Sequence, residues 1–392
     1  MSRVDTLRTA LVRTGFLFGR LTPLRPRVLL ATAHADRIGG NLAWIRDGLR
    51  RDAPGVRVVE LADRVDRRRR QLPRLALSAF RAGFHLATAR LTVVDDYFFP
   101  MYVIRPRAGT TFVQVWHACG ALKRFGHSLG DREFGAASRR NRAVDIHSNY
   151  DRCLVSARQF APFYAEAFGV PEDRFTAQLG IPRTDLFFGA ERMARAAAAV
   201  RARYAIPADR RVILYAPTFR GNSVQAARAP EQLDLRVLRR VLGDDHVVLA
   251  REHPFVRRRA VEPELAGFVI DASDHEDVNE LMLVSDLLIT DYSSVLFEFA
   301  LLGRPMAFFA PDHADYEAER GFYVDYPAFV PGALFTESEA LAQHLRAGVF
   351  DVERVRRFAA QSFDIADGHA TGRFVADIVR PALGMPSTDR IG

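Results

Sequence analysis

The chain has 392 residues, more than one ordinary hydrophobic core organises, so its length favours two domains over one. Hydrophobic residues make up 48% and charged residues 26%, a composition that excludes a largely disordered protein. The formal net charge of +8 is carried almost entirely by arginine and suits the binding of phosphate or carboxylate, although solvated surface arginines explain it equally well.

Cysteine usage and the lengths of the apolar runs narrow the class of protein further. Cys119 and Cys153 are the only cysteines, and the chain has no CxxC pair and no Cys/His spacing of the zinc type. We therefore expect neither a disulfide framework nor a structural metal, which favours a cytoplasmic protein. The longest apolar runs fall short of the ~20 residues that a membrane span requires.

The first element that the pattern predicts is an N-terminal helix. Leu7, Leu11 and Phe18 share one face of this helix, and Arg13 and Arg20 lie opposite. Two interpretations remain open, because such a helix either lies on an anionic membrane surface or packs against the first domain.

Strands and helices then alternate in a way that indicates a parallel sheet. In the first half the expected strands are 27–33, 56–62, 91–96, 110–116 and 151–156, and the expected helices are 41–51, 72–89 and 159–169. After a turn-rich stretch at 179–188 and a helical segment at 190–204, the series repeats. The second half has expected strands at 211–217, 246–252, 268–271, 286–290 and 305–311, and expected helices at 233–243, 278–285 and 294–303.

This repetition predicts an α/β protein with two Rossmann-like domains facing a cleft, over residues 1–190 and 191–392, with the final helix allowed to pack back on the N-terminal domain. Open parallel sheets bind ligands at the carboxyl ends of their strands. The glycine-rich phosphate loops GxGxxG and GxxxxGK[ST] are both absent from the sequence, so any phosphate must be bound in another way.

One candidate site follows the strand near residue 116. Trp116 and His117 end that strand, and a neutral histidine at such a position is suited to take a proton from a hydroxyl. A structural, hydrogen-bonded histidine beside a core tryptophan is the competing interpretation.

Three strand ends in the second half carry polar side chains suited to phosphate. Thr218 and Arg220 follow the strand at 211–217, and His253 follows the strand at 246–252, where a capping or surface role is equally compatible. Ser293 and Ser294 stand at the start of an apolar helix, whose amide groups and hydroxyls suit a phosphate, although Ser293 alone as a helix cap is the simpler interpretation.

Two further segments are candidates for ligand contact. Glu298, one turn into that helix, either accepts hydrogen bonds from ribose hydroxyls or pairs with an arginine. Residues 312–332 form an expected charged and aromatic loop that either closes over a ligand, with Arg320 and Asp325 contributing, or is a solvated surface loop.

Six blocks taken in order resemble the CDP-glycerol glycerophosphotransferase family, in its shorter, primase-like members. They are WHACGALKRFG, LGIPRTDLFF, YAPTFRG, REHP, DLLITDYSSVLFEFALLGRPMAFF and DYEAERGFYVDY, and with DGHATGR the likeness spans roughly residues 105 to 375. The resemblance implies a glycosyltransferase-B-like fold. It also implies transfer of glycerol phosphate, or ribitol phosphate, from CDP-glycerol or CDP-ribitol to an undecaprenyl-diphosphate-linked acceptor in teichoic acid or related cell-wall polymer synthesis.

The resemblance assigns a role to each candidate residue. His117 is implied to activate the acceptor hydroxyl, and Trp116, Lys123 and Asn41 to line the acceptor side. The implied donor-binding residues, with His253 also taking part in catalysis, are Thr218, Arg220, His253, Ser293, Ser294, Glu298, Arg320 and Asp325.

The same resemblance limits cofactors and partners. No metal and no cofactor are expected, because the pairs Asp95–Asp96 and Asp244–Asp245 lack DxD spacing. The protein is expected at the inner face of the plasma membrane, attached peripherally. A nucleotide-sugar glycosyltransferase of the same fold is the alternative. A basic protein that binds membrane or nucleic acid through clusters such as Arg67–Arg70 is the other rival, although nothing in the sequence resembles a nucleic-acid module.

Overall fold

The computed structural model of the chain describes residues 3–33, 35–62, 72–130, 144–221, 228–230, 233–253, 256 and 260–386. The arginine cluster at 67–70 lies outside the described residues. The chain forms two compact units, each assembled from separate stretches of sequence. The first unit contains Met1–His117, Ala137–Asp185 and Asp364–Gly392, and the second contains Ala118–Ala136 and Leu186–Phe363.

The first unit is built on a parallel sheet of six strands in the order β2-β1-β3-β4-β5-β6. These strands are β1 (Arg25–Thr32), β2 (Arg57–Ala62), β3 (Ala89–Val94), β4 (Thr111–Gln114), β5 (Arg152–Leu154) and β6 (Phe175–Thr176). Val28 to Ala31 in β1 are fully buried, as expected for a strand covered on both faces.

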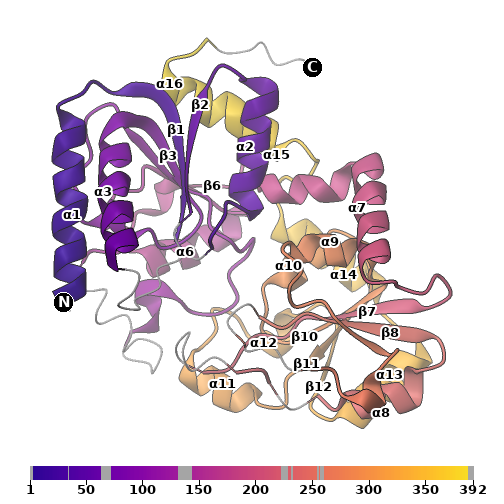
Figure 1. Ribbon diagram of the computed structural model, residues 1–392. Coiled ribbons are helices and arrows are strands. Elements are labelled where there is room, and N and C mark those ends of the chain that lie inside the picture. Colours follow the sequence, from indigo (N-terminus) through magenta and orange to yellow (C-terminus); the bar gives the residue numbers. More distant parts are fainter. Residues whose placement is uncertain are drawn as a thin grey trace. The chain divides into compact units, whose positions relative to one another are not determined.

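Helices cover both faces of this sheet (Figure 1). They are α1 (Arg3–Arg20), α2 (Gly40–Asp52), α3 (Leu72–Thr88), α4 (Phe99–Tyr102), α6 (Ala161–Phe168), α15 (Ala370–Phe374) and α16 (Arg380–Leu383). The last two come from the end of the chain and pack beside α2 and β3.

The N-terminal helix α1 packs along α3. A Cβ atom at Gly15 would lie 2.1 Å from the carbonyl oxygen of Phe80, and one at Gly83 would lie 2.0 Å from that of Val12. Glycine therefore brings the two helix backbones together. Leu7 and Phe18 stay more than half exposed on the outer side of α1.

The second unit is built on another parallel sheet of six strands, in the order β12-β11-β10-β7-β8-β9. These strands are β7 (Arg211–Tyr215), β8 (His246–Ala250), β9 (Val269–Asp271), β10 (Leu287–Thr290), β11 (Met306–Phe309) and β12 (Ala333–Phe335). Numbered within the unit, this is the order 6-5-4-1-2-3 of a Rossmann sheet. The predicted fold class, α/β with two Rossmann-like halves, is confirmed.

Helices lie on both faces of this second sheet as well (Figure 1). They are α7 (Ala190–Arg203), α8 (Leu235–Leu242), α9 (Val278–Val284), α10 (Val295–Ala300), α11 (His313–Glu319), α12 (Tyr326–Phe329), α13 (Ser338–Ala347) and α14 (Val352–Ser362).

The interpretation of 312–332 as a loop is wrong, because α11 and α12 occupy most of this segment. Its aromatic side chains belong to the core: Tyr316, Phe322 and Tyr326 are at most 8% exposed and pack around Tyr292. Burial of these rings holds the segment in place, which neither a mobile lid nor a solvated connector would require.

Candidate functional site

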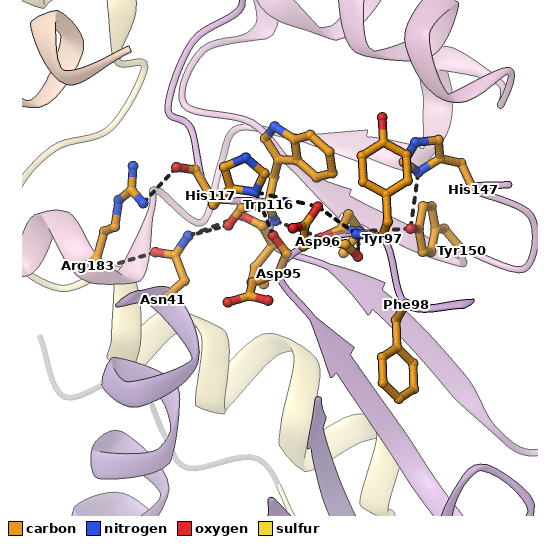
Figure 2. Close-up of polar contacts among 12 residues, drawn as sticks. Asn41, Asp95, Asp96, Tyr97, Phe98, Trp116, His117, His147, Tyr150 and Arg183 are labelled. Carbon is orange, nitrogen blue, oxygen red and sulfur yellow. Dashed lines mark hydrogen bonds and ion pairs between the residues drawn. The ribbon is translucent and has the colours of Figure 1, made fainter. Parts of the chain in front are cut away.

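In the first unit the candidate residues gather where the strand order turns from β1 to β3, at the carboxyl ends of the strands. Asn41 lies in the first turn of α2, which follows β1. Asp95 and Asp96 follow β3, and Trp116 and His117 follow β4. Figure 2 shows these residues grouped around His117, whose ring contacts the backbone oxygen of Asp95 and the carboxylate of Asp96.

The hydrogen bonding of His117 fixes which ring nitrogen carries a proton. Its Nδ1 lies 3.0 Å from the backbone oxygen of Asp95, and because a carbonyl oxygen only accepts, Nδ1 must donate. The carboxylate of Asp96 lies 3.9 Å from the same nitrogen and would stabilise a positively charged ring. The lone pair is left on Nε2, and the side chain is 46% exposed, so neutral His117 is arranged to accept a proton at Nε2.

The backbone that carries His117 is held in a strained conformation. Trp116 has a φ of +50°, a value that bulky residues rarely adopt. Asn41 Nδ2 donates to the carbonyl oxygens of Val115 and Trp116, at 3.2 and 2.9 Å, and Gln114 Oε1 accepts from the Trp116 amide at 2.9 Å. A strained backbone that several hydrogen bonds hold in place, as here, is typical of functional sites.

Trp116 itself is part of the core of the first unit. Its ring is stacked against that of His117 at 4.4 Å and meets the rings of Tyr97, His147 and Phe168 at their edges. Only 6% of Trp116 is exposed, so its buried ring forms a fixed surface on which the imidazole of His117 packs. The ring is thus hydrogen-bonded and packed on tryptophan, as the structural interpretation expected, and about half of the side chain reaches solvent.

Asn41 and Arg183 complete the support of this strand end. Asn41 is 3% exposed, and its Oδ1 accepts from the Arg183 amide at 3.0 Å. The guanidinium of Arg183 donates to the His117 carbonyl oxygen at 2.8 Å. Sequence reasoning did not assign Arg183 or Asp95 to the site. Arg183 stands in the block LGIPRTDLFF, whereas Asp95 acts through its backbone, which leaves no signal in the sequence.

In the second unit the strand order turns between β7 and β10, and polar residues again follow both strands. Arg220, after β7, donates from Nε and Nη2 to Asp312 and from Nη1 to Asp291 at 2.8 Å. All three side chains are at most 14% exposed. Burial lowers the pKa of Arg220, but the two carboxylates outweigh burial and raise it. We call Arg220, Asp291 and Asp312 the Arg220 clamp.

The clamp joins the loops that follow three neighbouring strands. The amide of Thr218 donates to Asp291 at 2.7 Å, and the hydroxyl of Tyr292 donates to Asp312 at 2.9 Å. Thr218 is 4% exposed, and its hydroxyl makes no hydrogen bond within the described part of the chain. Sequence reasoning missed Asp291 and Asp312, which pair with an arginine 71 and 92 residues away.

The remaining phosphate-binding candidates, His253, Ser293 and Ser294, lie near the same switch point in the strand order of the second sheet. The ring of His253 packs on that of Phe219 at 4.7 Å, which brings the ends of β8 and β7 together. Ser294, not Ser293, holds the N-cap position of α10, and its side chain makes no capping hydrogen bond. Both serines are half-buried.

The remaining donor-side candidates differ in burial. Glu298 is 2% exposed and accepts a hydrogen bond from Cys119 Sγ at 3.2 Å. Arg320 donates to the Tyr316 hydroxyl at 3.4 Å. Asp325 precedes α12 and is exposed.

Lys123 lies in the second unit, together with the donor-side candidates and apart from Asn41 and Trp116. Its backbone forms an antiparallel bridge with Phe322.

Two properties of the described residues bear on the class of protein. They include no group of three or more His, Cys, Asp and Glu side chains placed to hold a metal ion. None of the helices that are described is long and apolar enough to cross a membrane.

Two Rossmann-type units, one with a polarised histidine at a strand end and one with cations and hydroxyls at its switch point, define a glycosyltransferase-B-like α/β protein. Residues 18–380 match the family described as CDP-Glycerol:Poly(glycerophosphate) glycerophosphotransferase. The chain belongs to this family of enzymes, as the resemblance in its sequence predicted.

Relatives agree with this assignment, and a solved structure shares the fold. The chain is 37% identical to the teichoic acid ribitol-phosphate primase of Bacillus spizizenii, over 94% of each chain. It is 35% identical to the teichoic acid poly(ribitol-phosphate) polymerase of the same organism, over 99% of this chain and 62% of the polymerase. A variant of the wall teichoic acid polymerase TagF, solved after a soak with CDPG, matches the fold with a TM-score of 0.77 at 23% identity, over 98% of this chain and 99% of that one.

Proposed function

We propose that this chain transfers glycerol phosphate or ribitol phosphate from a CDP-polyol to a hydroxyl of a lipid-linked acceptor, with release of CMP, in the synthesis of teichoic acid or a related cell-surface polymer. Family membership and the relative named a ribitol-phosphate primase support the reaction class. The observation that carries the mechanism is the hydrogen bond from His117 Nδ1 to the Asp95 carbonyl oxygen.

In the proposed reaction His117 is the general base. Its Nε2 takes the proton of the acceptor hydroxyl while the hydroxyl oxygen attacks the phosphorus that bears the polyol. The bond from that phosphorus to the CMP oxygen breaks, and CMP leaves. Asp96 stabilises the imidazolium that forms, because its carboxylate lies 3.9 Å from Nδ1.

The second unit is proposed to bind the donor. His253, Ser293, Ser294 and the hydroxyl of Thr218 follow the strands at the switch point, where anionic ligands of Rossmann sheets bind. Glu298 is assigned to the ribose, and Arg320 and Asp325 to the rim of the donor site. The guanidinium of Arg220 is already paired to two carboxylates, so Arg220 is proposed to serve the donor site by holding its surrounding loops in place.

On the acceptor side Asn41 and Trp116 are proposed to act by holding His117. The amide of Asn41 and the ring of Trp116 are both buried, so they are suited to position the base.

Release of CMP from CDP-glycerol and from CDP-ribitol, with a lipid-linked disaccharide as acceptor, tests this function. We expect His117→Ala to lower kcat by about 10²- to 10⁴-fold, the usual contribution of a general base. His253→Ala should also lower activity, whereas His344→Ala on α13 should not. Transfer from a UDP- or GDP-sugar with neither CDP-polyol used would overturn the proposal in favour of a glycosyltransferase.

We also propose that the protein attaches peripherally to the cytoplasmic leaflet through an anionic lipid surface. A lipid-linked acceptor requires proximity to the membrane, and α1 exposes Leu7, Leu17 and Phe18 by 56 to 61% beside its arginines. Flotation with anionic vesicles at physiological salt tests attachment. Absence of the protein from the vesicle fraction would contradict it.

A further inference from the structure

Lys123 is the only lysine in a chain whose other basic residues, within a total of 55, are all arginine. Lysine offers a compact ammonium group that can lose its proton, whereas arginine offers a broad, permanently charged fork. Because every other basic residue of this total is arginine, the lysine at position 123 indicates that the smaller ammonium group is required there.

The backbone around Lys123 is fastened to the second unit. Lys123 is paired with Phe322 in an antiparallel bridge, and the flanking amides of Arg124 and Tyr323 donate to the carbonyl oxygens of Gly321 and Leu122, both at 3.0 Å. Just before this bridge, a Cβ atom at Gly120 would lie 2.3 Å from the ring of Phe297. The segment is thus held on both sides.

The bridge also determines the side on which Lys123 lies. Residues directly opposite each other in an antiparallel pair project to the same face. Phe322 packs against Tyr292 at 5.5 Å, and the ring of Tyr292 lies against the guanidinium of Arg220. Lys123 therefore projects toward the Arg220 clamp, while its neighbour Arg124 lies over the ring of Tyr323.

At this place Lys123 is half-buried, and its amine makes no hydrogen bond or ion pair with any residue that the structure describes. Burial, followed by the positive charge of Arg320, holds the pKa of Lys123 well below its usual range, and Arg220 adds to the effect while Asp291 opposes it. An amine that lies near Arg220 and Arg320 and forms no ion pair of its own is suited to an anion that arrives from outside, because such an anion would favour its charged form.

The charges of the clamp support the same conclusion. Arg220 already neutralises one of two carboxylates, so the clamp carries a net negative charge and by itself would repel a diphosphate. Lys123 and Arg320 interact electrostatically with the clamp and are the basic groups there that can supply positive charge to a diphosphate.

We propose that Lys123 binds an anionic oxygen of the donor's diphosphate, with Arg320 beside it, and that the Arg220 clamp holds the surrounding loops in place. This assignment rests on the proposed function and moves Lys123 from the acceptor side to the donor side. It gives the second unit a dedicated diphosphate contact in place of a glycine-rich loop.

Calorimetry with the full chain is the first test. Lys123→Met keeps most of the side-chain volume, and we expect it to weaken CDP-glycerol binding by about 10- to 100-fold, the loss of one hydrogen bond to a charged group. Binding of cytidine, which has no phosphate, should not change. The matched control is Arg124→Met, which removes the neighbouring cation from the opposite face and should leave both affinities unchanged.

A single lysine also permits a direct observation. Reductive methylation with ¹³C-formaldehyde labels only Lys123 and the terminal amine and keeps their charge. We expect CDP-glycerol and inorganic pyrophosphate to raise the pKa read from the Lys123 methyl resonance, because a nearby anion favours the charged form. A purely structural lysine would show no such shift.

The outcomes separate this inference from the proposed function. If pyrophosphate shifts the resonance but no CDP-polyol binds, the anion site stands and the proposed substrate falls. If CDP-glycerol binds equally to wild type and Lys123→Met and leaves the resonance unmoved, the donor role of Lys123 is overturned while the function stands. A resonance that responds only to the lipid-linked acceptor returns Lys123 to the acceptor side.

Discussion

Asn41 decides where the imidazole of His117 lies, because its amide holds two carbonyl oxygens of the strained strand end. We predict that Asn41→Ala lowers kcat by about 10- to 100-fold through misplacement of the base. The Kd for CDP-glycerol should stay unchanged, since the residue lies in the first unit. Steady-state kinetics and calorimetry on one preparation check both statements.

Asn149 provides a matched control for Asn41. It also binds two backbone oxygens, those of Met101 at 2.8 Å and Ile104 at 3.2 Å, but no hydrogen bond links it to Trp116 or His117. Asn149→Ala should lower stability by a similar amount and leave kcat nearly unchanged. An equal loss of kcat in both variants would mean that Asn41 acts only through general stability.

The Arg220 clamp makes Asp312 a determinant of stability. Asp312→Asn removes the charge that faces Arg220 and leaves a buried guanidinium poorly paired, so the free energy of unfolding should fall by about 2 kcal/mol. The exposed pair of Arg356 with Glu353 is the control, and Glu353→Gln should change the free energy of unfolding by less than about 0.5 kcal/mol. Urea denaturation measures both.

The clamp also gives stability a dependence on pH. Burial alone would raise the pKa of Asp312, but the hydrogen bonds and charge of Arg220 hold it below the ordinary value. A lowered pKa in the folded state means that the stabilisation is complete above the unfolded value near ~3.9 and is lost as the pH falls below it. We expect the urea midpoint of wild type to fall more steeply than that of Asp312→Asn between about pH 5 and pH 3. Parallel curves would contradict this origin.

At this scale the sequence predicts residues that follow strand ends and misses those that act across the fold. His117, Thr218, Arg220 and Ser293 were predicted because each directly follows an apolar run. The Asp95 carbonyl was not predicted, since any residue supplies such an oxygen. Asp312 was missed because the sequence alone does not show which arginine it pairs with.

Between elements, the contact of α1 with α3 depends on glycine. Gly83→Ala would place a methyl group 2.0 Å from the Val12 carbonyl oxygen, and backbone atoms cannot rotate away. We predict a loss of about 2 to 3 kcal/mol in the free energy of unfolding. Gly372→Ala is the control, because a Cβ atom at Gly372, within α15, would have no atom within 4 Å. There the same change should raise the free energy of unfolding by about 0.5 to 1 kcal/mol. A neutral Gly83→Ala would refute the close contact.

Most of the longer elements could be read from the sequence, although α13 and α14, of 10 and 11 residues, were not predicted. Strands with long apolar runs, such as β1 and β7, were predicted because both faces of a parallel sheet are buried. The strands β6 and β12, of two and three residues, were not predicted, whereas the equally short β5 and β9 were. The helices α11 and α12 carry mixed charged and aromatic side chains whose burial only the tertiary structure reveals.

On the scale of the whole molecule, the chain returns to its first unit after completing the second. The carboxylate of Asp185 accepts hydrogen bonds from the amides of Ala370 and Thr371, at 2.9 and 2.8 Å, and Thr371 packs closely on Gly48. The predicted domain division at residue 190 did not include this return as a fixed part of the first unit. Contacts between residues so distant in sequence leave no local pattern.

We predict that a chain ending at Phe363 keeps a folded second unit and loses a stable first unit. Limited proteolysis followed by mass spectrometry should show protected fragments from 186–363 and rapid cleavage within 3–117. The milder change Asp185→Ala should lower the protection of the first unit alone. Equal protection of 3–117 in the full and shortened chains would show that the return segment is dispensable.

The return of the chain has a consequence for biosynthesis. Most of the first unit is synthesised before the second, but the segment 364–392, which carries α15 and α16 and completes the first unit, follows all of 186–363. Domains ordinarily mature in the order in which they emerge. We therefore expect the first unit of this protein to complete its fold only after the second unit has been synthesised.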